Sequence, residues 1–113
     1  CSSDLHKILV KTVDDVRATN INDFVKGLPA FKGPTYISYD IDCLDPAFCP
    51  GTGTPVPGGL TTYEVQRILR ALQIDNLVGA DIVELSPPYD TSQISGLAAV
   101  DAMFELLSLM AQK

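Results

Sequence analysis

The chain has 113 residues and a formal net charge of −6, and 46% of its residues are hydrophobic. This length suits one domain, and this apolar content is enough to build a core. An acidic chain is a poor partner for nucleic acid or an anionic membrane, whereas a cationic small molecule fits it. No apolar run approaches the roughly 18 residues that a membrane span needs, and no signal peptide is visible. We therefore expect neither nucleic acid nor a membrane as a partner.

The cysteines and the histidine carry little chemistry. Cys1, Cys43 and Cys49 are odd in number and lack the spacing of a metal site. Free thiols in a reducing compartment are the simplest interpretation, and the cytoplasm and the mitochondrion both meet that condition. The only histidine, His6, stands in an exposed context, and we expect it to be neither a ligand nor a base.

The first part of the chain predicts a strand, a helix and a strand. Residues 6–13 contain a short apolar run and predict a strand. Apolar residues recur at helical spacing in residues 20–28, which predicts a helix. Residues 35–40 are β-branched and aromatic, which favours a second strand.

A loop rich in glycine and proline follows. Residues 46–59 hold four of the eight prolines and four of the eight glycines. Proline fixes φ and glycine permits unusual backbone angles, so this is a shaped loop and not a floppy linker. Thr61, with Glu64 three residues later, predicts the capping box that begins the next helix.

The last part of the chain predicts one more strand and one more helix. Residues 77–85 are nearly all apolar until Glu84, which is typical of a buried parallel strand. Residues 94–110 predict the final helix, whose inward face we expect to consist of Leu97, Val100, Phe104, Leu107 and Met110. Alternating strands and helices predict an α/β fold with a parallel sheet. Ligands of such sheets bind beyond the carboxyl ends of the strands.

Two carboxylates end the strand at residues 35–40. Asp40 and Asp42 lie two residues apart, so on a strand they point to the same side, roughly 6–7 Å apart. Such a pair repels unless a cation lies between the charges, and hard divalent ions such as Mn²⁺ and Mg²⁺ take carboxylate oxygens. The alternative is that both acids cap turns or meet solvent. The residues alone leave these two interpretations about equal.

Glu84 ends the other candidate strand, where a carboxylate needs a partner. A ligand guanidinium in bidentate contact would satisfy it, and the alternative is an arginine of the chain itself. On spacing alone, Asp81 is as good a candidate for the site acid as Glu84, but it would face the other side of the strand. Asp45 and Asp90 stand beside prolines or in turns, and we expect both to organise local backbone.

Three segments together resemble the ureohydrolase family, which includes arginase, agmatinase, guanidinobutyrase and formiminoglutamase. They are SYDIDCLDP at 38–46, GTGTP with GGLT at 51–61, and VELSPPYD at 83–90. The resemblance covers residues 35–113, and its last segment has the agmatinase-like form. It implies a three-layer α-β-α fold around a parallel sheet and a homo-oligomer, trimeric or hexameric. Residues 1–113 are then expected to be the C-terminal portion of a single ureohydrolase domain.

The same resemblance implies a reaction and a role for each acid. Two Mn²⁺ ions and a bridging hydroxide hydrolyse a guanidino group to urea and an amine, with agmatine as the leading substrate. Asp40 matches the ligand that bridges both ions, Asp42 a ligand of one, and Glu84 the residue that binds the guanidinium. Guanidinobutyrate and arginine are alternative substrates.

The chain also departs from the family pattern. The Gly-Gly-Asp-His and Asp-x-His-x-Asp segments, which supply further metal ligands in the family, are absent from the 113 residues. We therefore expect this portion alone to bind metal poorly and to be inactive. A non-catalytic, degenerate ureohydrolase-like domain is the second hypothesis. An acidic Mg²⁺ pocket on another α/β fold is the third, and it leaves the glycine- and proline-rich loop unexplained.

Overall fold

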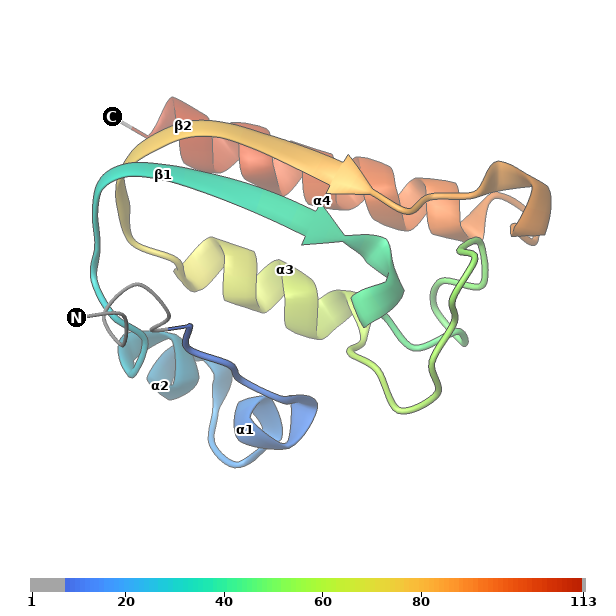
Figure 1. The fold of residues 1–113 in the computed structure, drawn as a ribbon, viewed down its shortest axis with the longest axis horizontal. Helices are drawn as coiled ribbons and strands as arrows, with labels where there is room; N and C mark the ends of the chain where they lie inside the picture. The colour runs from blue at the N-terminus through green and yellow to red at the C-terminus, as the bar shows by residue number, and fades with distance from the viewer. Residues whose placement is uncertain (1–7, 113) are drawn as a thin grey trace.

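The computed structural model describes residues 8–112, which form a small sheet with helices packed on it (Figure 1). The elements in chain order are α1 (Val13–Arg17), α2 (Ile21–Lys26), β1 (Phe31–Asp40), the 3-10 turn η1 (Ile41–Cys43), α3 (Thr62–Ala71), β2 (Ile74–Val83), the 3-10 turn η2 (Pro87–Tyr89) and α4 (Ile94–Ala111). Strands β1 and β2 are parallel neighbours. The predicted α/β class with a parallel sheet is confirmed.

One face of the sheet carries the core. Tyr39 of β1 and Ile41 of η1 pack with Val65 and Leu69 of α3 and with Leu106 of α4. Helices α3 and α4 also pack against each other, so they form one helical layer on this face. The opposite face is open among the described residues. One of the two helical layers of an α-β-α sandwich is therefore present.

Helix α3 begins where the sequence predicts. The Thr61 side chain accepts a hydrogen bond from the Glu64 N–H at 3.0 Å, and the Glu64 carboxylate accepts one from the Thr61 N–H at 2.8 Å. This reciprocal pair satisfies two of the N–H groups that a helix start leaves without partners. The register of the helix is thereby fixed from its first turn.

Helix α4 buries a different face from the one predicted. Leu97, Val100, Phe104 and Leu107 are 67%, 64%, 68% and 59% exposed. The buried line consists of Ser95, Ala99, Ala102, Glu105, Leu106 and Leu109. Small alanines allow α4 to approach β2 and α3 closely, whereas the larger residues point outward. The prediction was wrong because nearly the whole circumference of this helix is apolar, so periodicity could not select a face.

The prediction that no apolar run approaches the length of a membrane span was wrong for α4. This helix has 18 residues with a mean hydropathy of 1.6, so by length and composition alone it could cross a membrane. Its contacts identify it instead as a packed helix of the domain. Asp101 accepts a hydrogen bond from Gln66 of α3 at 2.7 Å. Glu105 is 6% exposed and pairs with Arg70 of α3 through Nε at 2.9 Å and Nη2 at 2.6 Å.

The prediction of a strand at residues 6–13 is also wrong for residues 8–13, the part that the structure describes. Residues 8–12 have no regular structure, and α1 begins at Val13. Thr12 and Asp15 form a second capping box. This box begins α1 at Val13, where the short apolar run had predicted an extended strand. His6 and Cys1 lie outside the described residues. The other strands and helices are where the sequence placed them, within a few residues at their ends.

Candidate active site

The parallel register brings the predicted site residues to one end of the sheet. Asp40 lies opposite Val83 in the ladder, so Glu84 follows directly beyond the strand that neighbours Asp40. The loop at residues 46–59 and the segment after β2 gather beyond the same ends of the strands (Figure 1). This is the edge at which open parallel sheets bind ligands.

Asp40 and Asp42 are close for a different reason from the one expected. Asp42 does not extend the strand, because the chain turns into η1 immediately after Asp40. Asp40 caps this turn, and its Oδ1 accepts a hydrogen bond from the Asp42 N–H at 3.1 Å. The alternation argument was therefore wrong for Asp42. A 3-10 turn, and not the pleat of a strand, sets the position of Asp42 relative to Asp40.

The two carboxylates are candidate metal ligands. Asp42 Oδ2 accepts a hydrogen bond from the Thr54 hydroxyl at 2.9 Å, and within the described residues Oδ1 of Asp42 and Oδ2 of Asp40 have no hydrogen-bond partner. Carboxylate oxygens are the donors that Mn²⁺ prefers. Within residues 8–112, however, no group of three or more His, Cys, Asp or Glu side chains could hold a metal ion. The acids therefore suit Mn²⁺ in chemistry, but further ligands must complete the site.

Glu84 is held in an unusual backbone conformation just after β2. Its φ is 69°, in the left-handed region that non-glycine residues rarely adopt. Such conformations cost free energy and concentrate at functional sites. The side chain is exposed, and Arg17 and Arg70 pair with Glu64 and Glu105 instead. Arg67, the third arginine, makes no ion pair with Glu84 either, so within the described residues no arginine neutralises Glu84.

The loop at residues 46–59 is closed at its base by backbone pairing. The Asp45 N–H donates to the Leu60 carbonyl, and the Leu60 N–H donates to the Cys43 carbonyl, each at 2.9 Å. Asp45 also accepts from the N–H groups of Ala47 and Gly58, which lower the pKa of its carboxyl. The predicted role of Asp45 as an organiser of the turn is confirmed.

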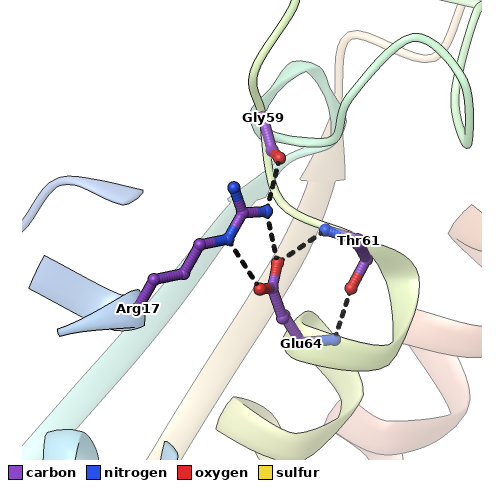
Figure 2. Close-up of polar contacts among 4 residues, drawn as sticks. All are labelled: Arg17, Gly59, Thr61 and Glu64. Atoms are coloured by element: carbon purple, nitrogen blue, oxygen red, sulfur yellow. Dashed lines mark hydrogen bonds and ion pairs between the residues drawn. The ribbon is translucent and has the colours of Figure 1, made fainter. Parts of the chain in front are cut away.

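Arg17 fixes the same loop base from outside, as Figure 2 shows. Its guanidinium contacts both oxygens of Glu64, at 2.9 and 3.1 Å, and donates to the Gly59 carbonyl at 3.1 Å. Gly59 has no room for a side chain, because a Cβ there would lie 2.6 Å from the Asp45 nitrogen. Helix α1 is thus tied to the loop that supplies Thr54 to Asp42. The sequence signalled neither Arg17 nor Thr54 as a site residue.

Asp81 lies beside the site on the open face of the sheet. It is paired in register with Ser38, and its carboxylate accepts hydrogen bonds from the Ser38 hydroxyl at 2.6 Å and the Tyr36 hydroxyl at 3.0 Å. Parallel partners point to the same side, so Asp81 shares the face of Asp40. The hydroxyl bond to Asp81 raises the pKa of Tyr36.

Asp90 organises the start of α4, as expected. Burial raises its pKa, but bonds from the N–H groups of Ser95, Gly96 and Thr91, together with the Ser95 hydroxyl, outweigh this effect and lower the pKa to about 2. The actual N-cap is Gln93, whose side chain makes no capping bond. The Ser95 hydroxyl also accepts a hydrogen bond from the Gly51 N–H, in the loop at residues 46–59.

The thiols near the site are free and poorly nucleophilic. Cys43 and Cys49 form no disulfide, as predicted. Burial raises the pKa of the Cys43 thiol to about 11 and also raises that of Cys49. Because the thiolate is the reactive form, neither group is suited to nucleophilic catalysis near neutral pH.

Comparison with known proteins decides the family. The family model described as "Arginase family" matches residues 2–108. The chain belongs to the arginase family. It is 47% identical to an agmatinase from Photorhabdus laumondii over 106 residues, which cover 92% of this chain and 34% of that protein. It is 54% identical to a guanidinopropionase from Pseudomonas aeruginosa over 80 residues, covering 71% and 25% of the two chains.

A solved arginase-family structure has the same fold. Proclavaminate amidino hydrolase from Streptomyces clavuligerus superposes with a TM-score of 0.85 at 38% identity, covering 97% of this chain and 38% of that one. The resemblance seen in the sequence motifs and the predicted arginase-like fold are therefore confirmed. The chain spans about a third of the length of the first of these relatives.

Proposed function

We propose that the protein to which this chain belongs hydrolyses a guanidino group to urea and an amine, with agmatine as its substrate and putrescine as the amine product. The observation that carries the proposal is the meeting of the Asp40–Asp42 pair and Glu84 at one end of neighbouring parallel strands. Agmatinases 47% and 50% identical to the chain support this choice of substrate.

Each acid has a separate task in this proposal. Asp40 and Asp42 would hold Mn²⁺ together with further ligands, because residues 8–112 supply no larger cluster. Bound Mn²⁺ supplies a water of lowered pKa, which is a nucleophile near neutral pH. Glu84 would receive the guanidinium through two parallel N–H···O bonds, which fix both its position and its orientation. Its strained backbone costs free energy that a purely structural surface residue has no reason to retain.

The described residues do not form a complete catalyst, and we propose that this portion alone is inactive. Only two of the acids lie in the metal-binding turn, and no larger ligand cluster exists within residues 8–112. The exposed apolar face of α4 and the unpaired outer edges of β1 and β2 are also surfaces that further sheet and helix would cover. Urea release by the isolated 113 residues with Mn²⁺ would contradict this.

A guanidino acid is the second candidate substrate. The guanidinopropionase from Pseudomonas aeruginosa is 54% identical over 80 aligned residues, and an agmatinase reaches the same identity over the same length, so identity does not separate the two substrates. Glu84 would serve either substrate equally, because both end in a guanidinium. The choice between them depends on groups that meet the far end of the substrate.

The decisive experiment measures urea release by the full-length protein with Mn²⁺ from agmatine, guanidinopropionate, guanidinobutyrate and arginine in parallel. Asp42→Ala and Glu84→Ala are the test variants, and Asp75→Ala, an exposed acid at the opposite end of β2, is the matched control. We expect both test variants to lose activity and the control to retain it. Binding of Mn²⁺ without urea from any of the four would refute the choice of substrates. Absence of both urea and metal binding would favour the degenerate-domain hypothesis.

Assembly and location complete the proposal. We propose a homo-oligomer, trimeric or hexameric, in the cytoplasm or the mitochondrion. The free thiols Cys43 and Cys49 support a reducing compartment. Light scattering of the full-length protein would test the assembly, and a monomer at micromolar concentration would contradict it.

A further inference from the structure

Two loops at the candidate site are joined through one backbone unit, that of Gly51. Its N–H donates to the Ser95 hydroxyl at 2.7 Å, and its carbonyl accepts from the Ser86 N–H at 2.7 Å. Gly51 lies three residues before Thr54, the partner of Asp42. Ser86 lies two residues after Glu84. The metal-binding side and the guanidinium-binding side of the site therefore meet at this point.

The junction is tightly packed as well as hydrogen-bonded. A Cβ on Gly51 would lie 2.8 Å from the Ser95 Cβ and 2.9 Å from the Asp90 Cβ, so only glycine fits there. Asp90 in turn accepts hydrogen bonds from the N–H groups of Ser95 and Gly96, at 2.9 and 3.0 Å. Ser95 itself is 0% exposed. Neither loop can shift against the other without breaking this packing.

Helix α4 does not need the Ser95 hydroxyl for its own formation. Asp90 already satisfies the N–H groups at the start of the helix. The residues that follow on the same buried line are Ala99 and Ala102, which have no polar side chain. The Ser95 hydroxyl accepts the hydrogen bond of the Gly51 N–H, which would otherwise be buried without a partner.

We propose that Ser95 is a positioning residue for the reaction, which sets the placement of the Asp42 side of the site relative to Glu84. This inference rests on the proposed function. Hydrolysis requires Glu84 to hold the guanidinium while its carbon faces the activated water near Asp40 and Asp42. A displacement of about 1 Å at such a site can lower the rate about 100-fold.

The test compares Ser95→Ala with Ala102→Gly in the full-length Mn²⁺ protein. Ala102 is 3% exposed on the same helix and in the same core, but it does not touch the junction, so it controls for loss of stability. We expect Ser95→Ala to lower kcat about 10- to 100-fold while KM and the Mn²⁺ dissociation constant change less than about threefold, because the groups that bind substrate and metal remain. Ala102→Gly should lower Tm with kcat close to that of the wild type.

The outcomes separate this inference from the proposed function. If the wild type releases urea and folded Ser95→Ala retains its kcat, the positioning role is overturned and the proposed function stands. If the wild type releases no urea, the proposed function and the inference both fail. If Ser95→Ala does not fold, the near-isosteric Ser95→Cys, whose sulfur is a weaker acceptor, decides the matter. A lowered kcat with unchanged Mn²⁺ affinity then supports the role, and an unchanged kcat overturns it.

Discussion

Removing the Thr54 hydroxyl isolates one contact of the candidate metal ligand Asp42. Thr54 lies in the loop at residues 46–59 and donates to Oδ2 of Asp42, which lies in η1, at 2.9 Å. Thr54→Val keeps the shape of the side chain and deletes the donor. Asp42 then retains its charge but loses the bond that orients one carboxylate oxygen.

The expected magnitude follows from the exposure of the pair. Loss of a partner that orients a metal ligand lowers metal affinity about 10- to 100-fold. Thr54 is exposed and Asp42 is half-buried, so water can replace part of the lost bond. We therefore expect the lower end, a roughly tenfold weaker Mn²⁺ affinity, which corresponds to about 1.4 kcal/mol.

Calorimetric titration of the full-length apoprotein with Mn²⁺ measures this change directly. Thr54→Ser retains the hydroxyl and is the matched control, which we expect to bind Mn²⁺ within about threefold of the wild type, or about 0.7 kcal/mol. The reasoning is refuted if Thr54→Val binds Mn²⁺ as tightly as the wild type, or if Thr54→Ser loses as much affinity as Thr54→Val.

Three further predictions concern stability and association. Arg70→Ala should destabilise the protein more than the double change Arg70→Met with Glu105→Leu, because the single change leaves the buried Glu105 carboxylate without its partner. Denaturant unfolding measures the two free energies of unfolding. A double variant less stable than Arg70→Ala would contradict the argument. Asp90 has a folded-state pKa of about 2, below its ordinary value of 3.8, so its contribution is present above about pH 4 and is lost as the pH falls toward 2. The Tm difference between the wild type and Asp90→Asn should therefore shrink from pH 6 to pH 2, and a constant difference would disprove the assignment. Phe104→Lys should reduce self-association of the isolated 113 residues in sedimentation, because Phe104 is 68% exposed on α4, and unchanged association would show that this face is not responsible.

The sequence alone determined the features that depend on neighbouring residues. The capping box of Thr61 and Glu64 fixed the start of α3, and the β-branched run before Asp40 fixed a strand. Glycines and prolines marked the loop at residues 46–59 as shaped. Three motifs in order were enough to indicate the arginase family, and the family model confirms it.

The tertiary structure decided everything that depends on contacts between distant segments. Only packing against α3 and β2 selected the alanine side of α4, because both sides of that helix are apolar. Only the turn after β1 showed how Asp42 approaches Asp40, since a motif does not state its backbone angles. The bond between Ser95 and Gly51 joins residues 44 positions apart, and local sequence contains no record of such a pairing. The candidate acids could therefore be proposed from the sequence, whereas the groups that hold them in place could not, because burial and hydrogen bonding across the fold assign those roles.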